Sequence, residues 1–331
     1  MIDSPPVLQV ENLKKYFSVS TGLFGRSNHV RAVDGLSFSI ARGETLSLVG
    51  ESGCGKSTVG KAILQLVKPT GGTVRLDGQR IDDLSPARMR SLRQNMQVVF
   101  QDPFSSLNPR RTVRDILAEP LLNFGLVRGA ADIDARVAAL LDKVRLPADA
   151  AGRYPHEFSG GQRQRICIAR ALAPGANLII CDEAVSALDV SVKAQIVNLL
   201  ADLQAELGLA LLFISHDLAI VEHMTHRVAV MYLGKIVEIA DRKSLFAHPR
   251  HPYTRALLTA VPIPDPSIKR QRIVLKGDVP SPLNPPSGCR FHTRCPYAFD
   301  RCRIEEPALT ARGPSQFAAC HLEDLPAIPS L

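Results

Sequence analysis

Apolar residues gather along this chain in short runs of strand length. Residues 45–49, 177–181 and 209–214 are mainly apolar, a pattern typical of strands buried on both faces of a parallel sheet. A helical period replaces this pattern over residues 112–172 and again over residues 190–207. Since strands alternate with helices in this way, the sequence predicts an α/β core built on a largely parallel sheet.

Further strands are predicted on either side of the first buried run and later in the chain. Each of these strands is indicated by alternating apolar positions, by glycine turns at its ends or by a short apolar run. The segments concerned are residues 7–10, 30–40, 71–78, 96–100 and 228–232.

Proline changes the pattern after residue 247. Fourteen of the chain's 24 prolines lie beyond that point, and Pro262, Pro264 and Pro266 occupy alternate positions. Proline cannot continue a regular helix or a central strand, so this part reads as a linker and a small loop-rich appendage. The sequence therefore predicts two units, residues 1–247 and residues 248–331.

Composition restricts the class of protein. The apolar runs are far shorter than the ~18 residues that a membrane helix needs, and the N-terminus has neither the basic nor the apolar region of an export signal. We therefore expect a cytosolic protein. The net charge of +8 comes from Lys and Arg that are scattered along the chain, which favours a solvated surface over a nucleic-acid site.

A glycine-rich loop joins the strand at residues 45–49 to a helix predicted to begin near Lys56. Residues 50–58 read Gly-Glu-Ser-Gly-Cys-Gly-Lys-Ser-Thr and fit the phosphate-binding pattern G-x-x-x-x-G-K-[ST]. Its glycines let backbone N–H groups point at phosphate oxygens, and the helix start adds positive potential. Lys56 can reach the β- and γ-phosphates, and the Ser57 hydroxyl can ligate Mg²⁺. The loop predicts a nucleoside triphosphate site made by Gly50, Ser52, Gly53, Cys54, Gly55, Lys56, Ser57 and Thr58.

Two further motifs accompany this loop. The apolar run at 177–181 ends in Asp182 and Glu183, of which the first can hold Mg²⁺ and the second can polarise an attacking water. Ser159 is a good N-cap for a helix whose first turn carries two glycines, and bare backbone donors there make a second anion site. A plain capped helix is the alternative, but a double glycine lowers helix stability and needs a reason.

With these motifs together, the chain resembles the nucleotide-binding domains of ABC transporters over about residues 7–245. Residues 159–162 are similar to the signature loop of that family, and residues 50–58 to its Walker A loop. The resemblance implies a P-loop NTPase fold with a RecA-like α/β core, an antiparallel β subdomain and a helical subdomain at about residues 112–172. It also implies an ATPase that uses ATP and Mg²⁺.

The same resemblance assigns roles to single residues. Gln101 is the Q-loop glutamine, Asp182 is the Walker B magnesium residue, and Glu183 is the catalytic carboxylate. His216 is the switch histidine that contacts the γ-phosphate. Catalysis is thus assigned to Lys56, Gln101, Glu183 and His216, and Mg²⁺ binding to Ser57, Gln101 and Asp182.

Other roles concern the base and a second subunit. Phe17 is the expected adenine-stacking residue and Tyr16 the alternative, because neighbours on a strand face opposite ways. Residues 186–189 correspond to the D-loop, which includes Asp189. In this family the signature loop of one subunit closes on ATP held by the other, so we expect a dimer in which the partner's nucleotide contacts Ser159, Gly160, Gly161 and Gln162.

Residues 100–110, 155–158 and 251–258 narrow the resemblance to the ATPase subunits of oligopeptide and dipeptide importers, and residues 285–292 strengthen it. Within that group the chain is most similar to the second, F-type, of two paralogous ATPases. The implied function is ATP hydrolysis for uptake of peptides or a related small solute, at the cytoplasmic face of the bacterial inner membrane. The implied partners are a paralogous ATPase, two transmembrane permease subunits and an extracytoplasmic solute-binding protein.

Four of the seven cysteines lie in the last 43 residues, spaced C-x₅-C-x₆-C-x₁₇-C. In a reducing cytosol such a group is more often a metal site than a set of disulfides, and thiolates suit an iron–sulfur cluster or zinc. Zinc sites usually show short Cys pairs, and none occurs here. A mixed zinc site with His292 and His321 is the alternative. The resemblance to peptide-importer ATPases favours one [4Fe–4S] cluster held by Cys289, Cys295, Cys302 and Cys320.

Two rival functions differ in class. Soluble ABC ATPases of DNA repair carry a long coiled coil between the Q-loop and the signature loop, and the 58 residues from Gln101 to Ser159 leave no room for one. Those of translation carry two ATPase domains, whereas this chain carries one phosphate loop. An ABC exporter is disfavoured by the cysteine-bearing tail. Nucleic acid is therefore not an expected partner.

Overall fold

A computed structural model describes residues 5–20, 27–261 and 273–326. Its centre is an eight-stranded sheet with the order β11-β12-β10-β9-β3-β8-β7-β6, in which β9, β3, β8, β7 and β6 pair in parallel. The predicted parallel core is thus present. Its strands are β3 (Thr45–Val49), β6 (Met96–Val99), β7 (Leu178–Asp182), β8 (Ala210–Ser215), β9 (Arg227–Tyr232), β10 (Lys235–Asp241), β11 (Thr310–Gly313) and β12 (Gln316–Ala318).

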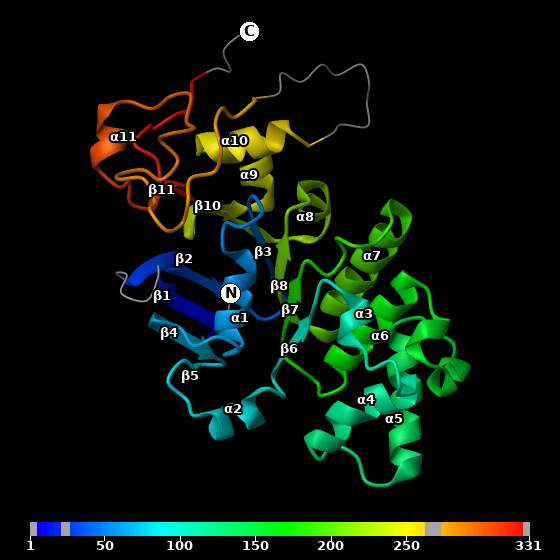
Figure 1. Cartoon of the computed structure of the whole chain (residues 1–331). Helices are drawn as coiled ribbons and strands as arrows, with labels where there is room; N and C mark the ends of the chain where they lie inside the picture. The colour runs from blue at the N-terminus through cyan, green and yellow to red at the C-terminus, as the bar shows by residue number, and fades with distance from the viewer. Residues whose placement is uncertain (1–4, 21–26, 262–272, 327–331) are drawn as a thin grey trace.

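A second, antiparallel sheet of four strands has the order β2-β1-β4-β5. Helix α1 (Lys56–Ile63) packs between this sheet and one face of the central sheet, in a continuous apolar core that contains Leu13, Val59 and Leu48. Figure 1 shows this sheet in blue beside α1. Its strands are β1 (Leu8–Ser20), β2 (Ser27–Ile40), β4 (Gly71–Leu76) and β5 (Gln79–Arg80).

Helices cover the other face and project from it as a separate lobe (Figure 1). The lobe lies within the range predicted to be helical, residues 112–172, and α7 has the bounds of the helix predicted over residues 190–207. The helices of this face and of the lobe are α3 (Pro103–Ser106), α4 (Val113–Asn123), α5 (Ala130–Lys143), η1 (Ala148–Gly152), η2 (Pro155–Glu157), α6 (Gly160–Leu172), α7 (Val190–Leu207) and α8 (Leu218–Met224). Helix α2 (Pro86–Leu92) instead packs through Met89 into the apolar core that contains α1.

The C-terminal part is more regular than its proline content predicts. Strand β12 pairs antiparallel with β10, with Glu238 opposite Ala318, so the tail extends the edge of the central sheet. Residues 262–272, with the three alternating prolines, lie outside the described residues. The remaining helices are α9 (Arg242–Ala247), α10 (Pro252–Thr259) and α11 (Asp300–Ile304).

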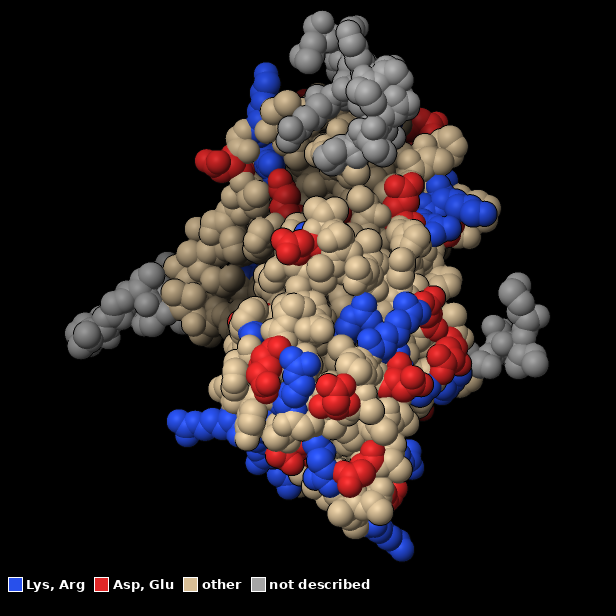
Figure 2. Space-filling view, turned by 90° about the vertical axis from the view of Figure 1, so that its right-hand side faces the viewer, with Lys and Arg blue, Asp and Glu red and all other residues tan. Residues whose placement is uncertain are grey.

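Charged side chains of both signs share the visible surface. On the face that Figure 2 shows, Lys and Arg are interspersed with Asp and Glu rather than gathered in one patch. Within the described ranges, no helix has both the length and the apolar character needed to cross a membrane.

Candidate active site

The predicted catalytic residues follow four neighbouring strands. Strands β3, β8, β7 and β6 are adjacent and parallel, so their carboxyl ends lie at one edge of the sheet. The phosphate loop and His216 directly follow β3 and β8, Asp182 is the last residue of β7, and Gln101 lies two residues after β6. This is the edge at which open α/β sheets bind ligands.

Lys56 is buried inside the phosphate loop, at 4% exposure. Its Nζ donates to the carbonyl oxygens of Gly50 at 2.8 Å and Glu51 at 2.9 Å. Gly55 precedes the helix with φ 107°, and a Cβ there would lie 2.0 Å from the carbonyl oxygen of Ala32. Only glycine fits this position. The loop backbone therefore curls around the Lys56 ammonium, and such a curled loop can bind the phosphates of a nucleoside triphosphate.

Ser57 and Asp182 form the pair predicted to hold Mg²⁺. The Ser57 hydroxyl donates to Oδ1 of Asp182 at 2.8 Å. Burial raises the pKa of Asp182, while the Ser57 hydrogen bond and the charges of Lys61 and Lys56 oppose that shift. Both residues line a cavity of about 510 Å³ that Gln101 also lines. A hydroxyl, a carboxylate and an amide oxygen are hard ligands of the kind Mg²⁺ prefers, so these residues fit the expected ion.

Glu183 and His216 lie next to this pair. Nδ1 of His216 is 3.4 Å from Oε2 of Glu183, whose side chain is 18% exposed. Glu183 has φ 51°, and its N–H donates to the carbonyl of Ile214 on β8 at 3.0 Å. A left-handed conformation is unusual for a glutamate and is typical of functional sites. The structure therefore brings the predicted general base and the predicted switch histidine into contact.

The predicted signature loop lies apart from the phosphate loop. Ser159 caps α6: its hydroxyl accepts from the Gln162 N–H at 3.3 Å, while Gln162 Oε1 accepts from the Ser159 N–H at 3.0 Å. Within the described residues, no hydrogen bond or ion pair links residues 159–162 to residues 50–58, and the central sheet stands between α6 and α1 (Figure 1). Asp189 is exposed at the start of α7.

The two candidates for adenine stacking differ in their surroundings. Phe17 is 38% exposed, with Nζ of Lys15 at 4.9 Å from the ring centroid. The Tyr16 hydroxyl donates to Asp34, and burial raises the pKa of Tyr16 to about 12, with the Asp34 contact adding to the shift. Phe17 is thus the more exposed of the two rings, and its stacking on adenine stays a prediction.

Sequence reasoning missed some residues that contact the site. Arg170 of α6 lines the same cavity as Gln101 and Asp182, and it donates a hydrogen bond to the carbonyl of Ser106. Tyr253 of α10 accepts a hydrogen bond from the Glu51 N–H at 2.9 Å. Tyr253 lies within residues 251–258, which carry the resemblance, but the sequence assigned it no role, and no local pattern distinguishes Arg170 from other arginines. Only the fold brings the two residues to the site.

The expected iron–sulfur site is not supported. The described residues contain no group of three or more His, Cys, Asp or Glu side chains arranged to hold a metal ion. The four tail cysteines are nevertheless neighbours: the Cys289 N–H donates to the Cys302 carbonyl at 2.8 Å, and each thiol lies in the electrostatic field of others. Burial raises the pKa of Cys289 to about 11 and that of Cys295 to about 12. Cys302 is buried and the other three thiols are half-buried, so the four lie together in the tail without forming a metal-binding group among the described residues.

Comparison with known proteins identifies the family. The family model described as "ABC transporter" matches residues 33–186. The family model described as "Oligopeptide/dipeptide transporter, C-terminal region" matches residues 237–302. The chain is 53% identical to the oligopeptide transport ATP-binding protein AppF of Bacillus subtilis, over 96% of this chain and 97% of that protein. It is 54% identical to a probable peptide ABC transporter ATP-binding protein of Sinorhizobium fredii, over 96% of this chain and 90% of that protein.

Solved structures of ATP-binding cassettes are also similar to this chain. Similarity extends to cbiO1 of Clostridium perfringens, part of the ABC transporter complex cbiONQ, with a TM-score of 0.63, 28% identity and coverage of 73% of this chain and 91% of that chain. A dimeric ATP-binding cassette in a post-hydrolysis state with ADP and Pi gives a TM-score of 0.62 at 29% identity, covering 71% of this chain and 98% of that chain. The predicted P-loop NTPase fold is confirmed. The chain belongs to the ABC transporter family, in the group that carries the oligopeptide/dipeptide transporter C-terminal region.

Proposed function

We propose that this protein is the ATP-hydrolysing subunit of a bacterial ABC importer for di- or oligopeptides or a related small solute. One observation carries the proposal: relatives over nearly the whole chain are described as peptide or oligopeptide transport ATP-binding proteins. The matching C-terminal region supports the same class. The protein would act at the cytoplasmic face of the inner membrane, held there by permease subunits.

Each residue of the candidate site has a role in this reaction. Lys56 and the loop N–H groups bind the β- and γ-phosphates, and Ser57, Asp182 and Gln101 would hold Mg²⁺. The ion supplies positive charge against the phosphate oxygens. Glu183 orients and polarises the attacking water, and His216, in contact with Glu183, would face the γ-phosphate.

A second ATPase completes the site in this proposal. Among the residues that the structure describes, no hydrogen bond or ion pair joins residues 159–162 or Asp189 to the chain's own phosphate loop. A similar cassette of known structure is described as dimeric. We expect a paralogous subunit as the partner, with each signature loop closing on the other subunit's ATP. The permeases would dock beside Gln101, where Phe104 of α3 is 62% exposed.

A change at Gly160 tests this arrangement. A Cβ at Gly160 would meet Leu188 at 3.5 Å, an ordinary contact, whereas one at Gly161 would lie 2.4 Å from Cγ1 of Val192. Gly160→Leu should therefore fold and bind ATP as a monomer with unchanged affinity, yet fail to associate with the second ATPase in ATP. A large loss of ATP affinity in the isolated subunit would contradict the arrangement.

Uptake measurements test the transport function itself. A strain that lacks this subunit should lose uptake of labelled di- or oligopeptides and regain it with the wild-type gene but not with Lys56→Ala. Normal uptake of every tested peptide in the deletion strain would contradict the peptide class. Uptake of glutathione or nickel complexes alone would redirect the proposal to those solutes.

The [4Fe–4S] cluster, with zinc as its alternative, is a separate proposal. Its support is the spacing of the cysteines and their proximity in the fold. Metal analysis and an absorption spectrum after purification without oxygen test it. Stoichiometric zinc without iron would replace the cluster by zinc, and metal-free protein would reject both.

A further inference from the structure

The tail between Cys289 and Cys295 contacts the phosphate loop directly. Arg294 donates to both carboxylate oxygens of Glu51, at 2.6 and 3.1 Å. Glu51 is the second residue of the loop, immediately after Gly50. Such a bidentate pair fixes the orientation of both partners.

The Glu51 backbone is held at the same time. Its N–H donates to the Tyr253 hydroxyl at 2.9 Å, and its carbonyl accepts from Nζ of Lys56 at 2.9 Å. Tyr253 is fully buried and packs against Tyr232 and Phe291, with ring centroids 4.8 and 5.3 Å away. Elements from the C-terminal part thus fix both the side chain and the backbone of one loop residue.

Burial distinguishes this ion pair from the exposed Arg301–Glu305 pair of the same tail. The Arg294 side chain is 8% exposed and that of Glu51 27%. The Arg301–Glu305 pair of the same tail has similar bidentate geometry, but its side chains are 56% and 52% exposed. Exposed pairs hold geometry weakly because water competes for both ions, whereas a buried pair is costly to break.

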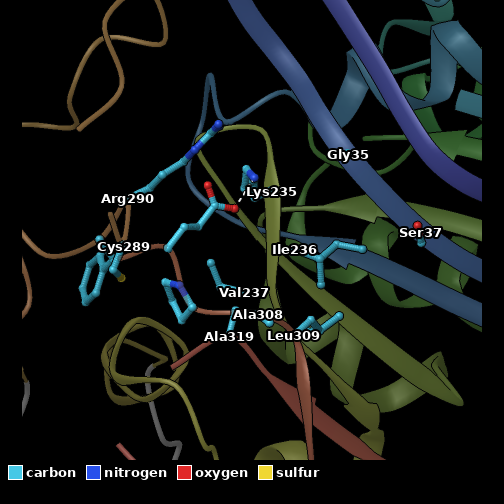
Figure 3. Close-up of a pocket in the computed structure, with 13 residues that line it drawn as sticks. Gly35, Ser37, Lys235, Ile236, Val237, Cys289, Arg290, Ala308, Leu309 and Ala319 are labelled. Carbon is cyan, nitrogen blue, oxygen red and sulfur yellow. Dashed lines mark hydrogen bonds and ion pairs between the residues drawn. The ribbon is translucent and has the colours of Figure 1, made fainter. Parts of the chain in front are cut away.

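A second arginine of the tail, Arg290, contacts the phosphate loop indirectly, through the turn at Leu233 and Gly234. Arg290, 7% exposed, pairs with Asp34 and donates to the carbonyl of Leu233. The next residue, Gly234, donates its N–H to the carbonyl of Cys54 in the phosphate loop at 2.9 Å. Figure 3 shows Arg290 extending from beside Cys289, at the rim of a cavity of about 380 Å³ between the tail and β10.

We propose that Arg294 is a positioning residue for the phosphate loop, and that Arg290 supports it. The C-terminal segment 289–295 holds residues 50–56 in the curled form that binds phosphates, so ATP does not have to organise the loop. A loop that is already in its binding conformation should raise the affinity for ATP and leave the rate of the chemical step unchanged. Neither arginine touches nucleotide or water in this role.

The test measures ATP affinity and turnover separately. In the full-length subunit, Arg294→Gln should raise the dissociation constant of Mg-ATP about tenfold by calorimetric titration. In the assembled transporter the KM for ATP should rise to a similar extent, while kcat at saturating ATP stays within about threefold. Arg294→Lys keeps the positive charge but loses the two parallel hydrogen bonds of the guanidinium, so this variant should recover part of the affinity for Mg-ATP. Arg301→Gln is the matched control and should change neither value.

A double-mutant cycle with Glu51 makes the test specific. Glu51→Gln should weaken ATP binding as much as Arg294→Gln, and the double variant should be no weaker than either single one, because both remove one interaction. Additive losses, or an Arg294→Gln dissociation constant within twofold of wild type, would overturn the proposal. If Arg294→Gln does not fold, the Arg294→Lys and Glu51→Gln variants give the same comparison.

Discussion

Lys56 and Phe17 represent the two kinds of group that a nucleotide needs from this chain. Lys56 is buried, and its ammonium is satisfied by loop carbonyls from which it can turn toward phosphates. Phe17 offers a partly exposed ring at the end of the antiparallel sheet. In the proposed function Lys56 binds the charged phosphates and Phe17 stacks on the flat base, so the two roles can be tested independently.

Replacement of Phe17 tests the adenine contact. Phe17→Ala should weaken ATP binding by roughly 1–3 kcal/mol, which is the value of stacking a base on an aromatic ring. Phe17→Trp keeps a ring and should bind ATP nearly as well as wild type. Calorimetric titration of the full-length subunit measures both. Unchanged affinity in Phe17→Ala would contradict the assignment, and a loss in Tyr16→Ala instead would transfer the role to Tyr16.

Sequence motifs indicated which residues would lie near one another, because each motif stands at the end of a strand whose neighbours are fixed by the fold; the chemical roles of these residues stay predictions. Asp182 and Ser57 were expected to share an ion and lie in hydrogen-bond contact. Arg294 and Tyr253 could not be found in this way. Their contacts with Glu51 join residues more than 200 positions apart and leave no local pattern.

Among the elements, α10 shows how a short helix depends on one buried group. His251 is 1% exposed, and its Nδ1 accepts the Tyr253 N–H at 3.1 Å as the N-cap. Its own N–H is bound by the carboxylate of Glu238 on β10. Burial lowers the pKa of His251 to about 3. The helix therefore requires the neutral imidazole.

This requirement predicts a pH dependence of stability. The folded pKa lies below the unfolded value of ~6.5, so the unfolded state takes up the proton first as pH falls. The stabilisation is complete above ~6.5 and is lost as pH falls toward 3, at about 1.4 kcal/mol per pH unit within that window. His251→Asn keeps a capping oxygen but does not titrate.

Urea unfolding of both proteins at pH 7.5 and pH 5 measures the difference. The free energy of unfolding should fall less in His251→Asn than in wild type between these pH values, by roughly 2 kcal/mol. Other titrating groups are common to both proteins and cancel in the comparison. Equal losses in the two proteins would show that His251 does not control the acid sensitivity.

Over the whole molecule, the tail is part of the ATPase body. Strand β12 extends the central sheet, and Arg290 and Arg294 connect the tail to the nucleotide side of the core. Composition predicted a loop-rich appendage, since proline excludes regular helices and central strands. It could not predict a strand as short as β12, whose position depends on pairing with β10 rather than on its own three residues.

The central claim is that Glu183 of this subunit activates water for hydrolysis of ATP held by Lys56 and its loop. ATP hydrolysis by the assembled transporter, with the bound nucleotide counted, tests it most directly. Glu183→Gln should retain ATP in its site while hydrolysis falls at least about 100-fold, because loss of a general base costs that much. Glu206→Gln, an exposed change at the far end of α7, should hydrolyse ATP like wild type. Hydrolysis by Glu183→Gln at close to the wild-type rate would contradict the account.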